Sequence, residues 1–349
     1  MDFTFTEEQL LLRDSTRNLL TAEVTPSRLR RQWKSHGIAD TDLWGKMLDL
    51  GIISSTIPEE LGGSGLNSVD FVLLAEECGY VALLEPVVYT ALVVVPLLCE
   101  LEGDFPRELL SGLVKGDYRI SVACPFTGLV EDADTSEFVL KFNSNKDLVA
   151  CSVTGAELSP IRSIDPGRRV FSLKECEPGK VLMENERFEC LHELLINLMA
   201  FANAAQLLGL SQRMLDLAVS YTKDRYQFNK PIGSFQAVKH LLANVAIKLE
   251  FAKPCVYRAA HSLLKCVPKR SLHVSHAKIA ACEAASLAAK NSLQAHGAMG
   301  YTWEYDLHVF IKRSLVLSST GGDLGFHKAR LLDSLFSDDF QLGPAATFS

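Results

Sequence analysis

Residues 225–236 read RYQFNKPIGSFQ, and residues 294–304 read QAHGAMGYTWE. Each stretch interrupts a long pattern of apolar residues at helical spacing. Asn229-Lys230-Pro231 ends one helical pattern, and the two glycines of the second stretch end another. The sequence therefore predicts long helices joined by short loops between residues 191 and 336.

The first loop carries a cation and aromatic residues at close spacing. Arg225 and Phe228 are three residues apart, so we expect them on one face near the end of a helix. A guanidinium can bind a phosphate through two hydrogen bonds, and an aromatic ring can lie against an adenine or a ribose. The alternative is that Arg225 pairs with Asp224 or Glu304, and that Phe228 and Phe235 are core residues.

The first third of the chain also has a helical pattern. Thr6 is expected to cap the first helix, and Asn67 is expected to cap a longer one. Between them, residues 58–65 read PEELGGSG, where three glycines within four residues exclude a helix. Residues 6–117 therefore read as helices with one glycine-rich break.

Residues 118–190 have a different pattern. Gly, Pro, Asn and Asp separate short alternating or apolar runs, which is typical of a small β-domain. Such runs include residues 119–123, 138–142, 148–153, 169–173 and 180–183. The predicted fold class is α+β in three parts, with these boundaries: an N-terminal helical domain (1–117), a middle β-domain (118–195) and a C-terminal helical bundle (196–349).

Composition restricts the class of protein. The 349 residues are 48% hydrophobic, and the net charge of −7 argues against a general nucleic-acid binder. The charge is uneven, because residues 196–330 carry +10, so the basic part is expected to face an anion. Nine cysteines without a Cys-x-x-Cys pair indicate reduced thiols and a cytoplasmic protein.

Neither a membrane segment nor a metal site is expected. The N-terminus lacks the basic start and apolar run of a signal peptide. The most apolar stretch, residues 87–99, is too short to span a bilayer and is expected to be a buried helix. His273 and His276 lie three apart, but no carboxylate or cysteine recurs at matching spacing, so a metal site is disfavoured.

Taken in order around a small β-domain, PEELGGSG and the two loop motifs resemble the acyl-CoA dehydrogenase family. The resemblance covers nearly the whole chain and is weakest between residues 118 and 195. It implies FAD as the cofactor and an acyl-CoA substrate. It also implies that the two loops contact the adenosine and pyrophosphate of a flavin across a subunit interface. The residues at these positions are Arg225, Phe228, Phe235, Gln236, Gln294 and Gly297.

The chain departs from the family pattern at the catalytic base. The resemblance places a Glu in the turn after the helix that carries Arg313, or, in a minority of members, on the helix that precedes Arg225. Gly321 stands at the first position, and Met199 and Ala200 stand at the second. Asp323 lies two residues beyond the first position, where its side chain is expected to point elsewhere.

The segment that covers the flavin ring in the family has no clear match either. This combination resembles one chain of the heterotetrameric (α2β2) dehydrogenases of bacterial steroid side-chain breakdown. It implies a second, acyl-CoA dehydrogenase-like partner chain that supplies the base, and electron-transfer flavoprotein as electron acceptor. Two alternatives stay open: a self-sufficient homo-oligomeric dehydrogenase with a displaced base, and a flavin-free scaffold subunit.

Overall fold

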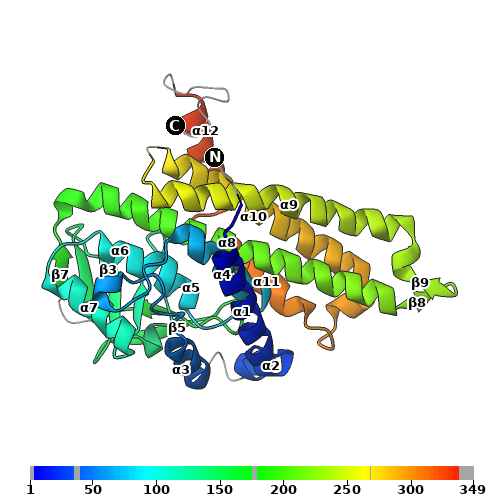
Figure 1. The fold of residues 1–349 in the computed structure, drawn as a ribbon, viewed down its shortest axis with the longest axis horizontal. Helices are drawn as coiled ribbons and strands as arrows, with labels where there is room; N and C mark the ends of the chain where they lie inside the picture. Colours follow the sequence, from blue (N-terminus) through cyan, green and yellow to red (C-terminus); the bar gives the residue numbers. More distant parts are fainter. Residues whose placement is uncertain (1–3, 35–39, 175–178, 268, 338–349) are drawn as a thin grey trace. The chain divides into compact units, whose positions relative to one another are not determined.

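A computed structural model describes residues 4–34, 40–174, 179–267 and 269–337 (Figure 1). The chain forms two compact units, and each unit combines segments that are far apart in the sequence. The first unit contains residues 1–22, 72–83 and 203–349, and the second contains residues 23–71 and 84–202.

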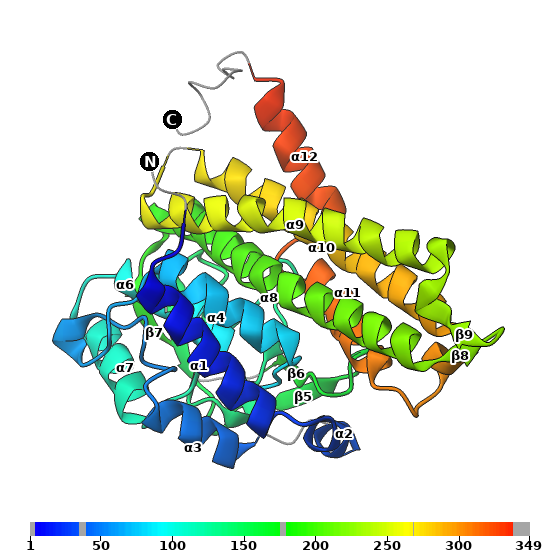
Figure 2. The same cartoon turned by 45° about the vertical axis from the view of Figure 1, so that its right-hand side comes forward.

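Long helices build the first unit. α9 (Gln236–Leu264) and α10 (Arg270–His296) are joined by a short connection, and they lie side by side in both views (Figures 1 and 2). α11 (Leu307–Ser319) and α12 (Leu324–Leu335) pack on α10. Small side chains at the contacts of α10 permit close helix packing, as the alanine-rich sequence predicts; among the buried ones are Ala277, Ala281, Ala284, Ala285 and Ala288.

Two glycines mark where α4 (Ser68–Tyr80) crosses α8 (Phe188–Asp224) in the first unit. A Cβ on Gly79 would lie 2.1 Å from the carbonyl oxygen of Gln206, and one on Gly209 would lie 1.9 Å from that of Glu76. Real side chains do not approach backbone atoms so closely, so only glycine allows this crossing. α1 (Glu7–Glu23) is also part of the contact, since Arg17 binds the carboxylate of Glu77 with two hydrogen bonds.

Both predicted helix caps are confirmed. The Thr6 hydroxyl accepts the N–H of Gln9, while the Gln9 side chain accepts the N–H of Thr6, which is a capping box at the start of α1. The Asn67 side chain accepts the N–H groups of Val69 and Asp70, and the Asp70 carboxylate accepts the N–H of Asn67. These local pairs fix where the two helices begin.

The second unit contains the predicted β-structure. One sheet has the strand order β1-β3-β4-β7, in which β1 runs parallel to β3 and the other neighbours are antiparallel. A second sheet has the order β2-β6-β5. Val130, Ala133 and Val139 form a fully buried core in this region. The strands are β1 (Ile120–Val122), β2 (Val130–Glu131), β3 (Phe138–Phe142), β4 (Leu148–Ser152), β5 (Leu158–Ile161), β6 (Val170–Leu173) and β7 (Lys180–Met183).

Helices of the second unit include a buried apolar segment. α5 (Val87–Tyr89), a π-helical turn (Thr90–Val94) and α6 (Val95–Cys99) follow one another, and most of their residues are buried. The expectation that this apolar run is a core helix is confirmed. The other helices of the unit are α2 (Pro26–Lys34), α3 (Thr41–Asp49) and α7 (Asp104–Lys115).

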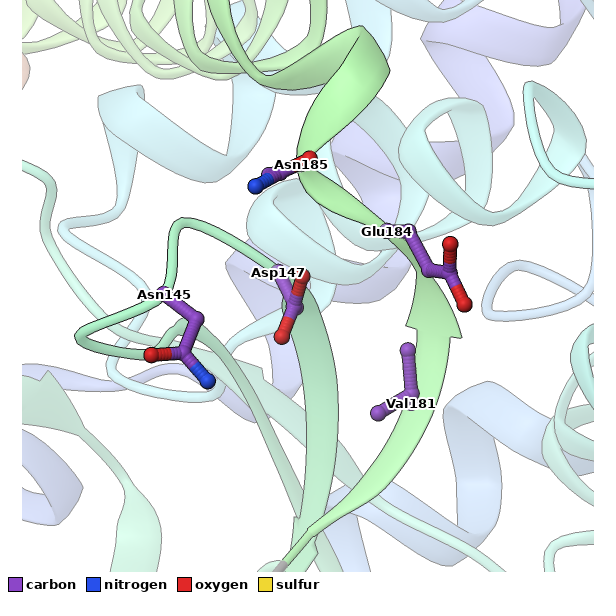
Figure 3. Close-up of a pocket in the computed structure, with 5 residues that line it drawn as sticks. All are labelled: Asn145, Asp147, Val181, Glu184 and Asn185. Carbon is purple, nitrogen blue, oxygen red and sulfur yellow. The ribbon is translucent and has the colours of Figure 1, made fainter.

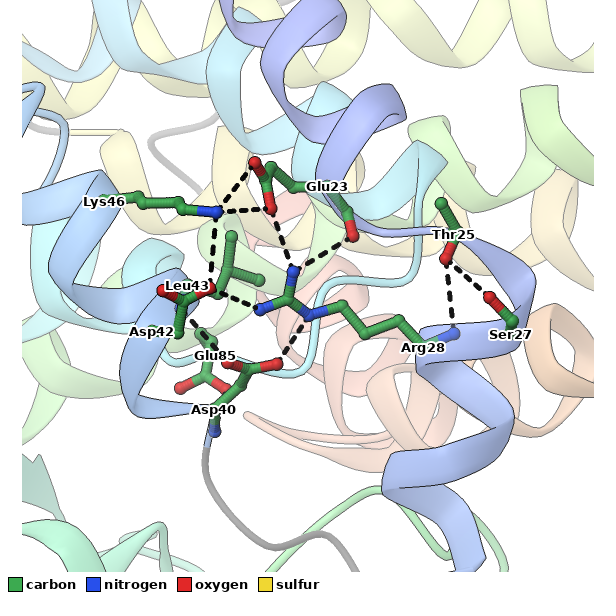
Figure 4. A network of polar contacts seen from close by, with 9 residues as sticks. All are labelled: Glu23, Thr25, Ser27, Arg28, Asp40, Asp42, Leu43, Lys46 and Glu85. Carbon is green, nitrogen blue, oxygen red and sulfur yellow. Dashed lines mark hydrogen bonds and ion pairs between the residues drawn. The ribbon is translucent and has the colours of Figure 1, made fainter.

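A network of charged side chains ties α2 to α3 within the second unit (Figure 4). The Arg28 guanidinium donates to the carboxylates of Glu23 at 2.9 Å and Asp40 at 2.5 Å. Asp40 also caps α3, and its backbone N–H donates to the Glu85 carboxylate at 2.9 Å. Hydrogen bonding to Arg28 holds the pKa of Asp40 below its usual value.

One helical segment of the described residues, Asn185–Asp224, is long and apolar enough to cross a membrane. Its most apolar window is completely buried in the protein, which is also typical of a core helix. The eight cysteines within the described ranges are all free thiols.

Candidate functional site

The first motif forms a tight hairpin rather than the end of a helix. α8 ends at Asp224, and β8 (Tyr226–Gln227) pairs with β9 (Lys230–Pro231). Phe228 and Asn229 form the two-residue turn, and both have positive φ, at 52° and 61°. The expectation that Arg225 and Phe228 share a helix face is therefore wrong, because a hairpin with two left-handed residues replaces the last helical turn.

The hairpin presents its side chains to solvent. Phe228 is 86% exposed, so the alternative that it is a core residue is wrong. Phe235 is half-buried, lies edge-on to Phe228 at 6.1 Å, and has the Lys230 ammonium 4.2 Å above its ring. An exposed phenyl ring on a left-handed residue is unfavourable in an isolated chain, which indicates a binding surface.

Arg225 is exposed and lies at the start of the hairpin, directly after the end of α8. Among the described residues it forms an ion pair with neither Asp224 nor Glu304, the two partners considered from the sequence. Its backbone carbonyl accepts the N–H of Ile232 at 2.8 Å, which closes the hairpin. The backbone of Arg225 is therefore held in the hairpin, and its guanidinium is not neutralised by these two carboxylates.

The second motif forms a glycine loop at the end of α10. Gly297 has φ 58° and ψ −138°, a conformation open to glycine alone, and its N–H donates to the carbonyls of Gln294 and Leu293. No atom lies within 4 Å of the position where its Cβ would be. Gln294 is exposed at the same place. The loop thus presents backbone to open space.

Stacked rings bring the two motifs to the same end of the helices. The His296 ring stacks on Tyr221 with centroids 4.4 Å apart, and Tyr305 lies edge-on to both. Tyr221 precedes the hairpin by four residues, and His296 immediately precedes the glycine loop. His296 donates from Nδ1 to the Ser292 carbonyl, and burial lowers its pKa, so the ring is neutral at neutral pH.

The N-terminus of α9 adds a further anion-binding feature. Gln236 is its first residue, Phe235 is the N-cap, and no side chain caps the exposed N–H groups. A helix of 29 residues has a partial positive charge at this end. The guanidinium of Arg225 and these N–H groups are donors suited to a phosphate group, and the open space at Gly297 lets such a group approach the backbone.

Three exposed aromatic residues were missed by the sequence reasoning. Tyr226 is 61% exposed, Tyr301 is 79% exposed and Trp303 is 69% exposed. The Lys312 ammonium lies 4.7 Å above the Trp303 ring. Their spacing within the two motifs was visible in the sequence, but only the structure shows that these rings are uncovered.

The turn at the presumed base position contains no carboxylate. Thr320, Gly321 and Gly322 link α11 to α12, and both glycines have positive φ. Asp323 is exposed, and its Oδ1 accepts the N–H of Phe326 at 2.8 Å, so its carboxylate is the N-cap of α12. This role agrees with the expectation that Asp323 points elsewhere.

Met199 and Ala200, at the alternative base position, are both buried on α8. Within the described residues, no group of three or more His, Cys, Asp or Glu side chains could hold a metal ion. His273 instead has structural contacts, since Arg258 donates to its Nε2 at 2.6 Å and its Nδ1 lies 2.5 Å from the Ser262 hydroxyl. Burial lowers the pKa of His273 to about 4.

A hollow of about 470 Å³ opens on the second unit, at the end of the β3–β4 hairpin (Figure 3). Asn145, Asp147, Val181, Glu184 and Asn185 line it. Two carboxylates in the lining make it unsuited to the phosphates of a nucleotide. It is therefore separate in its chemistry from the cationic and aromatic surface of the first unit.

Comparison with known families and structures gives one consistent result. Residues 6–114 match the N-terminal domain of acyl-CoA dehydrogenases, and residues 191–336 match the C-terminal domain. The acyl-CoA dehydrogenase IpdE2 of Mycobacterium tuberculosis is 29% identical over 309 residues, which cover 88% of this chain and 91% of that protein.

Solved structures share the fold. The ChsE4–ChsE5 complex from Mycobacterium tuberculosis contains a chain with a TM-score of 0.86 and 22% identity, covering 96% of this chain and 99% of that one. The Tcur3481–Tcur3483 steroid ACAD contains one with a TM-score of 0.83 and 24% identity, covering 94% and 97%. The matches to both family domains agree with the fold of the whole chain. The protein belongs to the acyl-CoA dehydrogenase family.

Proposed function

We propose that this chain is the FAD-binding, base-free subunit of a heteromeric acyl-CoA dehydrogenase. The complex introduces an α,β double bond into an acyl-CoA thioester. The observation that carries the proposal is the turn after α11, where Gly321 and Gly322 offer no carboxylate and Asp323 is committed to capping a helix. A second acyl-CoA dehydrogenase-like chain then supplies the base.

The surface of the first unit fits the adenosine and pyrophosphate part of FAD. Its donors are the Arg225 guanidinium and the N–H groups at the start of α9, and Gly297 leaves room for a phosphate to approach the backbone. The exposed Phe228 ring offers a face to an adenine. Gln236 and Gln294 can hydrogen-bond to the ribose and pyrophosphate.

When bound, FAD would supply the acceptor for the hydride of the substrate's β-carbon. The residues of this chain would hold the cofactor by its phosphates, with Arg225 donating hydrogen bonds to them. Removal of the α-proton needs a carboxylate within hydrogen-bond reach of that carbon in a site sheltered from water. Neither Gly321 nor the buried apolar pair Met199 and Ala200 has a group that could take this proton.

The names of two similar structures bear on the partner and the substrate that we propose for this chain. The ChsE4–ChsE5 structure is by its name a complex of two different chains, and the Tcur3481–Tcur3483 protein is by its name a steroid ACAD. These names support a heterotetramer and a steroid-derived acyl-CoA for this chain. We propose electron-transfer flavoprotein as the electron acceptor and the cytoplasm as the location.

The test is expression of the chain alone and together with candidate partner chains. Flavin absorbance and the mass of each species show whether FAD and a heterotetramer form. Anaerobic flavin bleaching with straight-chain and steroid-derived acyl-CoA thioesters shows turnover. We expect turnover in the mixed assembly alone, and its loss when the partner's catalytic Glu is replaced.

Two outcomes would refute the proposal. Robust turnover by the isolated chain, abolished by Asp323→Asn, would make it a self-sufficient enzyme with a displaced base. A mixed assembly whose flavin is bound entirely by the other chain would make it a flavin-free scaffold. Asp333→Asn serves as a matched control, because Asp333 is an exposed carboxylate on the helix that Asp323 caps.

A further inference from the structure

The outer face of α9 carries large apolar side chains that are open to solvent. One side of the helix packs into the first unit through buried residues such as Val245, Leu249 and Ala252. On the other side, Ile247 is 55% exposed and Phe251 is 73% exposed. These two are four residues apart, so they follow one another along the same stripe of the helix. The solvent face of a helix is normally polar, so this stripe indicates a contact surface.

Charges of opposite sign lie on either side of Leu249, between the two apolar residues. The Lys248 ammonium shares the Glu283 carboxylate with Lys328, at 2.7 and 3.5 Å, so one carboxylate serves two ammonium groups. The Glu250 carboxylate is exposed, and its ion-pair partner is a neighbouring lysine of the same helix. Since Lys248 is also partly exposed, both charges are accessible to a second molecule.

A proline lies on the same face, one turn beyond Glu250. Pro254 is exposed inside α9, and it has no N–H to donate to the Glu250 carbonyl four residues before it. Asn244 is exposed as well, five residues before Leu249, and Pro254 follows Leu249 by the same number. An asparagine side chain can donate to a carbonyl oxygen. The face thus has an amide donor and a carbonyl without its helical donor on opposite sides of Leu249.

An antiparallel second copy of α9 fits this pattern. About a two-fold axis at the level of Leu249, each residue before it faces the residue that follows it by the same number. Ile247 then faces Phe251, and Lys248 faces Glu250. The amide likewise faces the proline and the carbonyl that the proline leaves free. A parallel copy would instead set each Lys248 against another Lys248, so the charges favour the antiparallel arrangement.

We propose that two copies of this chain associate through α9, antiparallel, about a two-fold axis at the level of Leu249. The occupant of the stripe is a second copy because its apolar groups and its charges complement themselves. This contact goes beyond the proposed function and does not depend on it. In an α2β2 assembly it places the two copies of this chain in direct contact, and the chain alone pairs in the same way.

Sedimentation velocity of the full chain, alone and in the mixed assembly, measures the association. Ile247→Glu and Phe251→Glu each place a carboxylate in the stripe. Leu315→Glu is the matched control, because Leu315 is 52% exposed on α11 of the same unit. Circular dichroism shows whether each variant keeps the fold.

A charge exchange tests the antiparallel register. Glu250→Lys sets two lysines against each other across the axis, and addition of Lys248→Glu restores opposite charges in reversed order. We expect the dissociation constant of the pair to rise at least fiftyfold in Phe251→Glu and at least fivefold in Glu250→Lys. The double variant should return to within twofold of the wild-type value, and Leu315→Glu should behave as wild type.

A wild-type chain that stays monomeric at micromolar concentrations would overturn the inference, as would a pair that Phe251→Glu leaves intact. A double variant that associates no better than Glu250→Lys alone would also overturn it. If Phe251→Glu fails to fold, the charge exchange decides the matter. Loss of the partner chain rather than the second copy from the mixed assembly would assign the stripe to that chain. A chain that pairs with itself but binds no partner chain would refute the proposed function and leave this contact standing.

Discussion

Replacement of Glu85 by Gln is expected to change how the stability of the second unit depends on pH. Glu85 is 5% exposed, and its Oε1 accepts the backbone N–H of Asp40, a contact that Gln preserves. Among the described residues its Oε2 has no hydrogen-bond partner. Burial, and then the Asp132 carboxylate, raise its pKa to about 7, against the opposing effects of the Asp40 hydrogen bond, Arg169 and Arg119.

The direction of the pH dependence follows from which form of the Glu85 carboxyl group the fold disfavours. The pKa rises from 4.5 in the unfolded chain to about 7 in the folded one, so folding disfavours the ionised form. The contribution of Glu85 to the free energy of unfolding is complete below pH 4.5 and is lost as the pH rises through 7. At 1.36 kcal/mol for each pKa unit, the loss is about 3 kcal/mol above pH 8.

Urea unfolding followed by tryptophan fluorescence tests this prediction. In a Trp303→Phe background, the remaining Trp33 and Trp44 both lie in the second unit and report its unfolding. We expect Glu85→Gln to flatten the fall in unfolding free energy between pH 5 and pH 8. Glu184→Gln, at an exposed carboxylate of the same unit, should not. The same pH slope in Glu85→Gln and wild type would refute the reasoning.

Three further outcomes are expected. Gly79→Ala places a Cβ 2.1 Å from the Gln206 carbonyl oxygen, so thermal denaturation should show a free energy of unfolding lower by at least about 3 kcal/mol. Gly45→Ala is the control, because no atom lies within 4 Å of its new Cβ, and its free energy of unfolding should stay within about 1 kcal/mol of wild type. Arg225→Ala should weaken FAD binding in the mixed assembly roughly ten- to hundredfold, since a charge-assisted hydrogen bond contributes about 1.5–3 kcal/mol; flavin titration showing full retention would contradict the assigned role. Gly321→Glu in the isolated chain should give no dehydrogenation above background, and measurable reduction of an artificial acceptor would show that a base is all it lacks.

Local signals in the sequence were sufficient for most of the secondary structure. The reciprocal caps at Thr6 and Asn67 involve neighbours two or three residues away, so the residue pattern alone reveals them. Five predicted β-runs became β1, β3, β4, β6 and β7. β2 and β5 were missed: β2 has two residues only, and Pro160 argues against a strand at β5, where it is tolerated because β5 lies at the edge of its sheet.

In the candidate site, too, the sequence predicted the types of residue and the structure showed how they are arranged. The types of residue in the two loop motifs already suggested a phosphate and an aromatic group, and the structure places both motifs at one end of the helices through Tyr221 and His296. The sequence did not reveal that Phe228 occupies a hairpin turn, because the two-residue connection depends on pairing between β8 and β9. The FAD roles of these residues stay predictions.

Taken by itself, the sequence determined most of the helical and β segments, the family resemblance and the lack of a carboxylate at residues 320–322. These follow from residue type and from spacing within a few residues. Only the tertiary structure showed that Lys278, Asn203 and His327 meet at one turn, because these residues lie on three different helices. Packing alone brings such distant groups together, and a buried ammonium is stable where packing supplies carbonyl oxygens to receive its hydrogens.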